Sequence, residues 1–232
     1  MSPAPKRKTP TRSTPKKAAP LPPVARRSFS FDRMWRLVRW PLLIVALLYI
    51  ALVIYRIPAV GDQQKTTQAV AQIQSQHITL ADVMGDNLPF VPYEPNNDAT
   101  VAGIDQNNNG IRDDVELAIF KLHPDSAKIR AAELQYALDQ QIMITEVLNN
   151  QTWIAAAQED SRGFACIGDS VPITSDSSKD LKTVNARAKE VRDLVLNTPA
   201  RQNAWHTAYN FTTSYGDLNA SDCDIDINLL PN

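Results

Sequence analysis

Oxygen-bearing side chains recur at short, regular intervals between Asp105 and Glu116. With Asp105 as position 1 of a twelve-residue segment, positions 3, 5, 9 and 12 also carry side-chain oxygens, from Asn107, Asn109, Asp113 and Glu116. Gly110 at position 6 permits a sharp turn, and the backbone carbonyl of Ile111 at position 7 supplies a further oxygen. Hard cations take about six to eight oxygen ligands, so we expect this segment to wrap around one calcium ion.

The segment resembles the calcium loop of EF-hands, and it is more similar to the loops of thrombospondin type 3 repeats and related bacterial envelope proteins. Those loops often read Asp-x-Asn-x-Asp-Gly-Ile-x-Asp. The resemblance covers residues 105–116 only, with no match over the rest of the chain. The ligands that it implies are the side chains of Asp105, Asn107, Asn109 and Glu116, the backbone of Ile111, and Asp113 directly or through water.

Two features differ from an EF-hand. Position 8, usually aliphatic, is Arg112, and residues 97–103 ahead of the loop have no helical pattern. We therefore expect a structural site rather than a paired sensor, with a weak affinity of about 10⁻⁴–10⁻³ M because asparagines at positions 3 and 5 lower the ligand charge. The alternative is a Gly/Asn-rich turn whose Asp113 and Asp114 favour the N-terminus of the next helix.

Apolar residues at helical spacing dominate residues 61–232 and predict the elements that position this loop. Long helices are expected at about 125–149 and 178–196, and a third begins at Thr198-Pro199 and carries Ala200 to Phe211. Shorter helices are expected at about 62–75, 79–84, 113–122 and 152–163. Only the alternating residues 223–227 favour a strand. The predicted fold class is mostly α, with a helical bundle-like domain.

Two cysteines, Cys166 and Cys223, both fall in this part of the chain. In an oxidising compartment, an even pair that closes a loop of 57 residues predicts a disulfide, worth about 4 kcal/mol in the chain-entropy view. Two separate buried thiols are the alternative. Neither a Cys-x-x-Cys motif nor a nearby histidine supports a zinc or redox site.

An uncharged run from Pro41 to Tyr55 precedes the helical part. We expect one membrane-spanning helix at about 38–59, because a segment of this length covers most of a hydrocarbon core of about 30 Å. Arg33, Arg36 and Arg39 just ahead of it favour an N-terminus in the cytoplasm. A signal peptide cleaved near residues 59–61, or a twin-arginine signal at residues 26–29, is the alternative.

The charge of the chain is split between its two parts. Residues 1–60 hold twelve Lys/Arg and one acid, whereas residues 61–232 hold twelve Lys/Arg and twenty-four acids. The predicted organisation is a disordered, basic, proline-rich cytoplasmic tail at 1–27, a juxtamembrane and transmembrane segment at 28–60, and an extracytoplasmic domain at 61–232. The acidic balance of that domain argues against nucleic-acid binding there, and the basic flank favours contact with anionic lipid.

The sequence predicts no enzyme. No nucleophile or acid–base constellation is visible, and the three histidines show no metal-ligand spacing. Asp222, Asp224 and Asp226 are interpreted as an exposed acidic strand edge, with a second cation site as the alternative. The leading hypothesis is a single-pass protein of the inner membrane, whose periplasmic or extracellular domain binds one structural calcium ion and serves protein interaction or envelope organisation. The alternatives are a calcium-independent adaptor or binding subunit of a membrane complex and, third, an uncharacterised enzyme.

Overall fold

The computed structural model describes residues 31–216, 218 and 220–231, without the side chains of 31–33, 36 and 56–60. The chain divides into two compact units, the first ending at Ile54 and the second beginning at Tyr55, and each is described by itself. The predicted tail at 1–27 lies outside the described residues.

The first unit is formed by the apolar part of helix α1 (Phe31–Ile73). Residues Leu37–Tyr55 within this helix have a mean hydropathy of 2.5 over 19 residues, and none of that stretch is buried in the structure. A helix of this length and composition can cross a membrane. The structure thus confirms a candidate spanning helix where the sequence predicts one.

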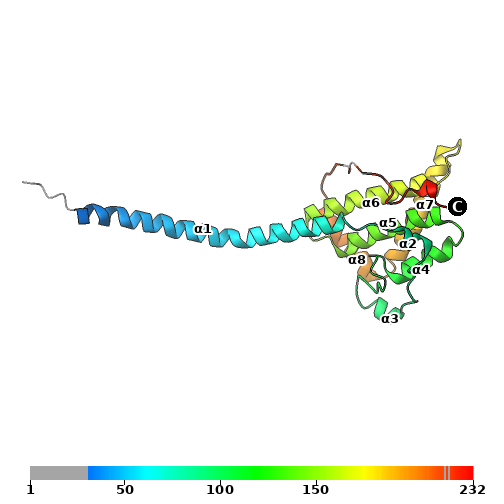
Figure 1. Ribbon diagram of the computed structural model, residues 1–232, viewed down its shortest axis with the longest axis horizontal. Coiled ribbons are helices and arrows are strands. Elements are labelled where there is room, and N and C mark those ends of the chain that lie inside the picture. The colour runs from blue at the N-terminus through cyan, green and yellow to red at the C-terminus, as the bar shows by residue number, and fades with distance from the viewer. Residues whose placement is uncertain (1–30, 217, 219, 232) are drawn as a thin grey trace, which may run out of the picture. The chain divides into compact units, whose positions relative to one another are not determined.

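The second unit is helical throughout its regular structure, as the sequence predicts (Figure 1). No strand occurs among the residues that the structure describes. After the end of α1, its elements are α2 (Leu80–Met84), α3 (Glu94–Asn97), α4 (Asp113–Leu122), α5 (Ala127–Thr145), α6 (Asn150–Ser170), α7 (Ser177–Val195), α8 (Pro199–Ala208) and the 3₁₀ turns η1 (Tyr209–Phe211) and η2 (Ile227–Leu229).

Helix α5 is the centre of this unit. It contacts α2, α4, α6, α7, α8 and η2, and Figure 1 shows it lying among them. The apolar residues at helical spacing along α5 are all buried, at Ala127, Ala131, Leu134, Leu138 and Ile142, whereas Leu148, within the predicted helix at 125–149, lies beyond α5 and is 68% exposed. Polar residues between these positions, including Glu133 and Asp139, are buried as well. The helix is therefore enclosed on all sides and not only along one face.

Side-chain caps explain where most helices begin. Ser126 accepts a hydrogen bond from the Ile129 amide at the start of α5, and Thr198 does the same for the Arg201 amide at the start of α8. Helix α4 has the predicted bounds. Helix α5 ends at Thr145, four residues before the predicted end, because Asn149 caps α6 directly afterwards. Helix α7 begins at the cap Asp176.

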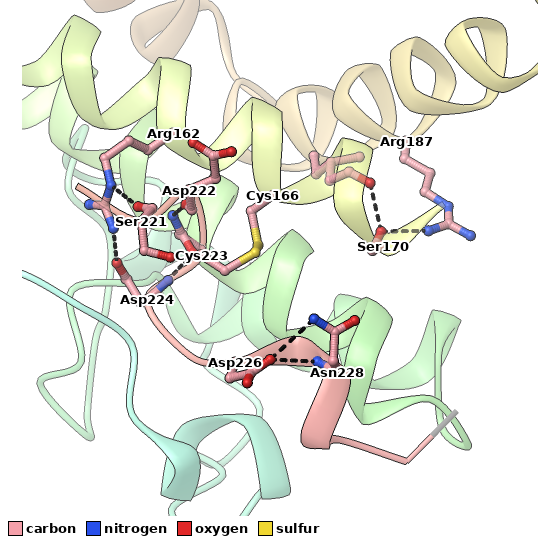
Figure 2. Close-up of a disulfide and its surroundings, with 12 residues drawn as sticks. Arg162, Cys166, Ser170, Arg187, Ser221, Asp222, Cys223, Asp224, Asp226 and Asn228 are labelled. Carbon is pink, nitrogen blue, oxygen red and sulfur yellow. Dashed lines mark hydrogen bonds and ion pairs between the residues drawn. A yellow bond between two sulfur atoms is a disulfide. The ribbon is translucent and has the colours of Figure 1, made fainter. Parts of the chain in front are cut away.

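The predicted strand at 223–227 is wrong. This segment is irregular and ends in η2, because no neighbouring strand pairs with it and its acids have other partners. Asp224 accepts from the Arg162 guanidinium on α6, and Asp226 accepts from the Asn228 amide (Figure 2). The predicted disulfide between Cys166 and Cys223 is confirmed, with a Cα–Cα distance of 5.0 Å.

Candidate calcium loop

The loop at residues 105–116 leads from the segment after α3 into the first turn of α4. Its tight turn is closed by Asp105, whose carboxylate oxygens accept from the Asn109 amide at 3.3 Å and from the Gly110 amide at 2.9 Å. Gly110 has a φ of 85°, as the sequence position requires. The turn is thus formed by the residue types that a calcium loop uses.

Glu116 and the two asparagines come together inside the loop. Asn107 Nδ2 donates to Glu116 Oε2 at 3.0 Å, whereas the buried Nδ2 atom of Asn109 has no hydrogen-bond partner. Glu116 is 0% exposed, yet its Oε1 atom has no hydrogen-bond partner, and neither does the buried Oδ1 atom of Asn107. Two buried acceptor oxygens therefore lack a donor, at positions 3 and 12 of the loop.

Burial changes how these carboxylates titrate. Loss of hydration raises the pKa of Glu116 to about 7, against the lowering effect of the nearby side-chain amides of Asn107 and Asn109. Burial likewise raises the pKa of Asp105, although the backbone amides of residues 108–110 oppose this rise. Both carboxylates therefore gain from a bound proton or from a nearby cation.

The two remaining predicted ligands differ from each other. Asp113 is fully buried, but its oxygens accept from the backbone amide and the side-chain amide of Gln106, at 2.9 Å and 2.6 Å. Helix α4 starts from the Arg112 carbonyl, which accepts from the Val115 and Glu116 amides. The Ile111 carbonyl, one residue earlier, takes no part in those bonds. The Asp113 carboxylate at position 9 is thus already hydrogen-bonded to Gln106. The Ile111 carbonyl at position 7 remains available as a ligand.

The side chains of the loop offer oxygen ligands only. Among the residues described, no three His, Cys, Asp or Glu side chains converge as metal ligands. The loop would complete a coordination shell only with the amide oxygens of Asn107 and Asn109 and a backbone carbonyl, which are neutral, hard ligands that calcium accepts.

Arg112 stands at position 8, where EF-hand loops usually have an aliphatic residue, and it connects the loop to α7 by hydrogen bonds. Its guanidinium is 0% exposed and donates to the carbonyls of Leu194 and Val195, at 2.8 Å and 3.0 Å, and also to the Asp114 carboxylate. Gly103 has a φ of 73°, and a Cβ atom there would lie 2.2 Å from Arg112 Cδ. An aliphatic residue at position 8 could not cap the last carbonyls of α7 in this way.

A second buried arginine, which the sequence does not single out, holds the segment before the loop. Arg201 on α8 is 0% exposed and donates to the carbonyls of Asn97 and Val101, at 2.6 Å and 3.1 Å. It also donates to the Asp98 carboxylate at 2.7 Å. Its contacts are about 100 residues away in sequence, so no local pattern could have identified it.

An open polar cavity of about 660 Å³ adjoins the loop. Asp105, Asn107 and Asn109 contribute to its wall, together with the chain around His77 and the side chain of Glu146. A cation in the loop would therefore be accessible to solvent from this side.

The other candidate groups are engaged within the structure. Asp224 has a side chain that is 4% exposed and accepts from Arg162, so the prediction of an exposed acidic edge is wrong for this residue. His77 lies 3.1 Å from the same carboxylate, and His123 Nε2 lies 3.0 Å from Glu133 Oε2. Because Asp224 already faces two cationic or donor groups, a second cation site there has no support.

Comparisons of the chain with models of protein families, with curated proteins and with solved structures find no match.

Proposed function

We propose that the chain is a single-pass membrane protein whose helical unit binds one structural calcium ion at residues 105–116 and serves as an interaction or envelope-organising module. The observation that carries the calcium site is Glu116, a carboxylate with no exposed surface and one oxygen without a hydrogen-bond partner. A buried carboxylate is costly unless a proton or a cation neutralises it. The unpartnered oxygen of Asn107 beside it adds a second hard ligand.

The ligand roles follow from the contacts. Asp105, Asn109 and Glu116 would bind through side-chain oxygens, Asn107 through Oδ1, and Ile111 through its carbonyl. Asp113 would act through water, because both of its oxygens hold Gln106. The bound ion would neutralise these acids and fix the N-terminus of α4.

The proposed location rests on the segment Leu37–Tyr55 and on the charge split. An apolar helix flanked by arginines on its N-terminal side supports an N-terminus in the cytoplasm and a helical unit outside the inner membrane. The Cys166–Cys223 disulfide fits an oxidising compartment.

The test is a thermal melt of the oxidised full chain in detergent, with calcium, with magnesium and with a chelator. At about 100 times its dissociation constant, calcium adds about 2.7 kcal/mol, or about 5–10 °C for a unit of this size. Glu116→Gln should abolish the rise, whereas Asp125→Asn, at an exposed acid outside the loop, should keep it. An equal rise with magnesium, or a full calcium response in Glu116→Gln, would refute the site.

The pH dependence of this response has a defined sign. The pKa of Glu116 is about 7 in the folded, ion-free protein, so a proton occupies the carboxylate below pH 7 and competes with calcium. The calcium affinity should fall by up to about tenfold per pH unit below pH 7 and be constant above pH 8. A melt at pH 5.5 should thus show a much smaller rise than one at pH 8.

A calcium-independent adaptor is the second candidate, and one observation favours it. Arg112 and Arg201 already hold the loop and the segment before it through backbone carbonyls. If calcium and chelator give the same melting temperature at pH 8, the loop is a turn that these arginines support, and this candidate stands.

A further inference from the structure

A proline-rich segment beside the loop exposes apolar side chains to solvent. Residues 88–93, Leu-Pro-Phe-Val-Pro-Tyr, run between α2 and α3 without regular structure, and we name this segment the strap. Phe90 and Val91 are each 85% exposed and Tyr93 is 68% exposed. Adjacent exposed apolar residues of this size are costly in water and mark a surface with a role beyond the packing of this chain.

Two loop residues hold the strap through its backbone. Gln106 Nε2 donates to the Phe90 carbonyl at 3.1 Å, inside the strap. Asn107 Nδ2 donates to the Asn87 carbonyl at 3.0 Å, directly before it. Both donors are side-chain amides at neighbouring positions of the candidate calcium loop.

Each of these donors is itself held by a proposed calcium ligand. Gln106 is fixed by Asp113, which accepts from its backbone and side-chain amides. Asn107 is a proposed ligand and donates to Glu116 as well as to Asn87. Gln106 is therefore the only side chain between Asp113 and the strap, and Asn107, itself a proposed ligand, bonds the backbone at Asn87 directly.

We propose that ion occupancy of the loop orders the strap, so that calcium determines whether Leu88–Tyr93 presents one defined apolar surface. This inference rests on the proposed calcium site. Coordination restricts Asn107 and Glu116, and also Asp113 through its water, and these residues hold the two donors in place. Pro89 and Pro92 already limit the conformations of the strap, so two anchor points are enough to fix it.

The experiment uses the oxidised full chain in detergent, labelled with 4-fluorophenylalanine at its six phenylalanines. The Phe90 resonance is assigned from its absence in Phe90→Leu. The fluorine line width reports nanosecond motion of the side chain. On addition of calcium the Phe90 line should broaden by about a factor of two, and magnesium should leave it narrow.

Gln106→Ala separates the strap from the ion site, because Gln106 is not a proposed ligand. In this variant the calcium-induced rise in melting temperature should remain while the Phe90 line stays narrow. Gln158→Ala is the matched control, since Gln158 also donates to a backbone carbonyl, that of Gly216 at 2.7 Å, away from the loop. It should keep both responses.

The two proposals fail differently. If calcium changes neither the melting temperature nor the Phe90 line, the calcium site is absent and this inference falls with it. If calcium raises the melting temperature but the Phe90 line does not broaden, the site stands and the link to the strap is refuted. Broadening of the Phe90 line by calcium that persists in Gln106→Ala would equally refute the link.

Discussion

Two groups of acidic side chains in the helical unit differ in their partners. Asp98, Asp114 and Asp224 lie in loops or in the first turn of a helix, and each faces an arginine. Glu116, Glu133 and Asp139 lie on α4 and α5, are at most 3% exposed, and each has an oxygen without a hydrogen-bond partner. The acids of the first group fix irregular backbone through their arginine partners. The buried carboxyl groups of the second favour binding of a proton or a cation.

The arginines explain why the carboxylates of the first group have hydrogen-bond partners. A guanidinium carries several donors in a planar fork, so it can bind a carboxylate and nearby carbonyls at the same time. Arg112 and Arg201 do so at the two sides of the segment that leads into the loop. The helix-borne acids have no such fork, and burial raises the pKa of Glu133 to about 8 and that of Asp139 well above its usual range.

Arg201→Ala should have the largest effect. It leaves the carbonyls of Asn97 and Val101 without a donor and removes the partner of Asp98. We expect a loss of about 3–5 kcal/mol in the free energy of unfolding, measured by denaturant titration of the oxidised full chain. Arg201→Lys should rescue little, because one ammonium cannot reach these separate acceptors. A loss below about 1 kcal/mol would contradict the role given to arginine.

Glu133→Gln should have a smaller effect of opposite sign. The pKa of Glu133 is raised to about 8 in the folded state, so its proton stabilises the fold at low pH and this contribution is lost as the pH rises towards 8. The neutral amide should therefore add about 1–3 kcal/mol at pH 9 and almost nothing near pH 4.5. Destabilisation of the variant at every pH would show that His123 Nε2, 3.0 Å from Glu133 Oε2, stabilises the carboxylate as an ion pair.

Lys189→Ala should have the smallest effect. The Lys189–Asp193 pair on α7 has side chains that are 73% and 62% exposed. Water and salt screen such pairs, so we expect a change within about 0.5 kcal/mol in the same titration. A change above 1 kcal/mol in the free energy of unfolding would mean that exposed ion pairs also stabilise this unit.

Local signals predicted most of the helices and the pairing of the cysteines, but they missed α3 and ended the predicted helix at residue 163, whereas α6 extends to Ser170. The acids at 113 and 114 with the apolar residues after them predict α4, and the spacing from Ala127 to Ile142 predicts the core face of α5. The burial of Glu133 and Asp139 could not be predicted, because it depends on how many helices surround α5.

The alternation at 223–227 misled the sequence analysis for an identifiable reason. Asp224 and Asp226 point to Arg162 and to the Asn228 amide, while Ile227 packs in the core, so the pattern reflects contacts and not a sheet. In the loop, the spacing indicates which oxygens can serve as ligands. The hydrogen bonds from Gln106 to Asp113 and the burial of Arg112 could not be predicted, since both depend on tertiary packing.

Contacts between residues that are far apart in the sequence determine the order in which parts of this unit can fold. Asp224 accepts from the Ile78 amide and from Arg162, and Cys223 is bonded to α6, so the segment just after α1 is held by residues near the C-terminus. A chain that leaves the ribosome or crosses a membrane from its N-terminus cannot make these contacts until residues 221–224 have emerged. Emergence of residues 221–224, and not synthesis of the helices alone, therefore determines when these contacts can form.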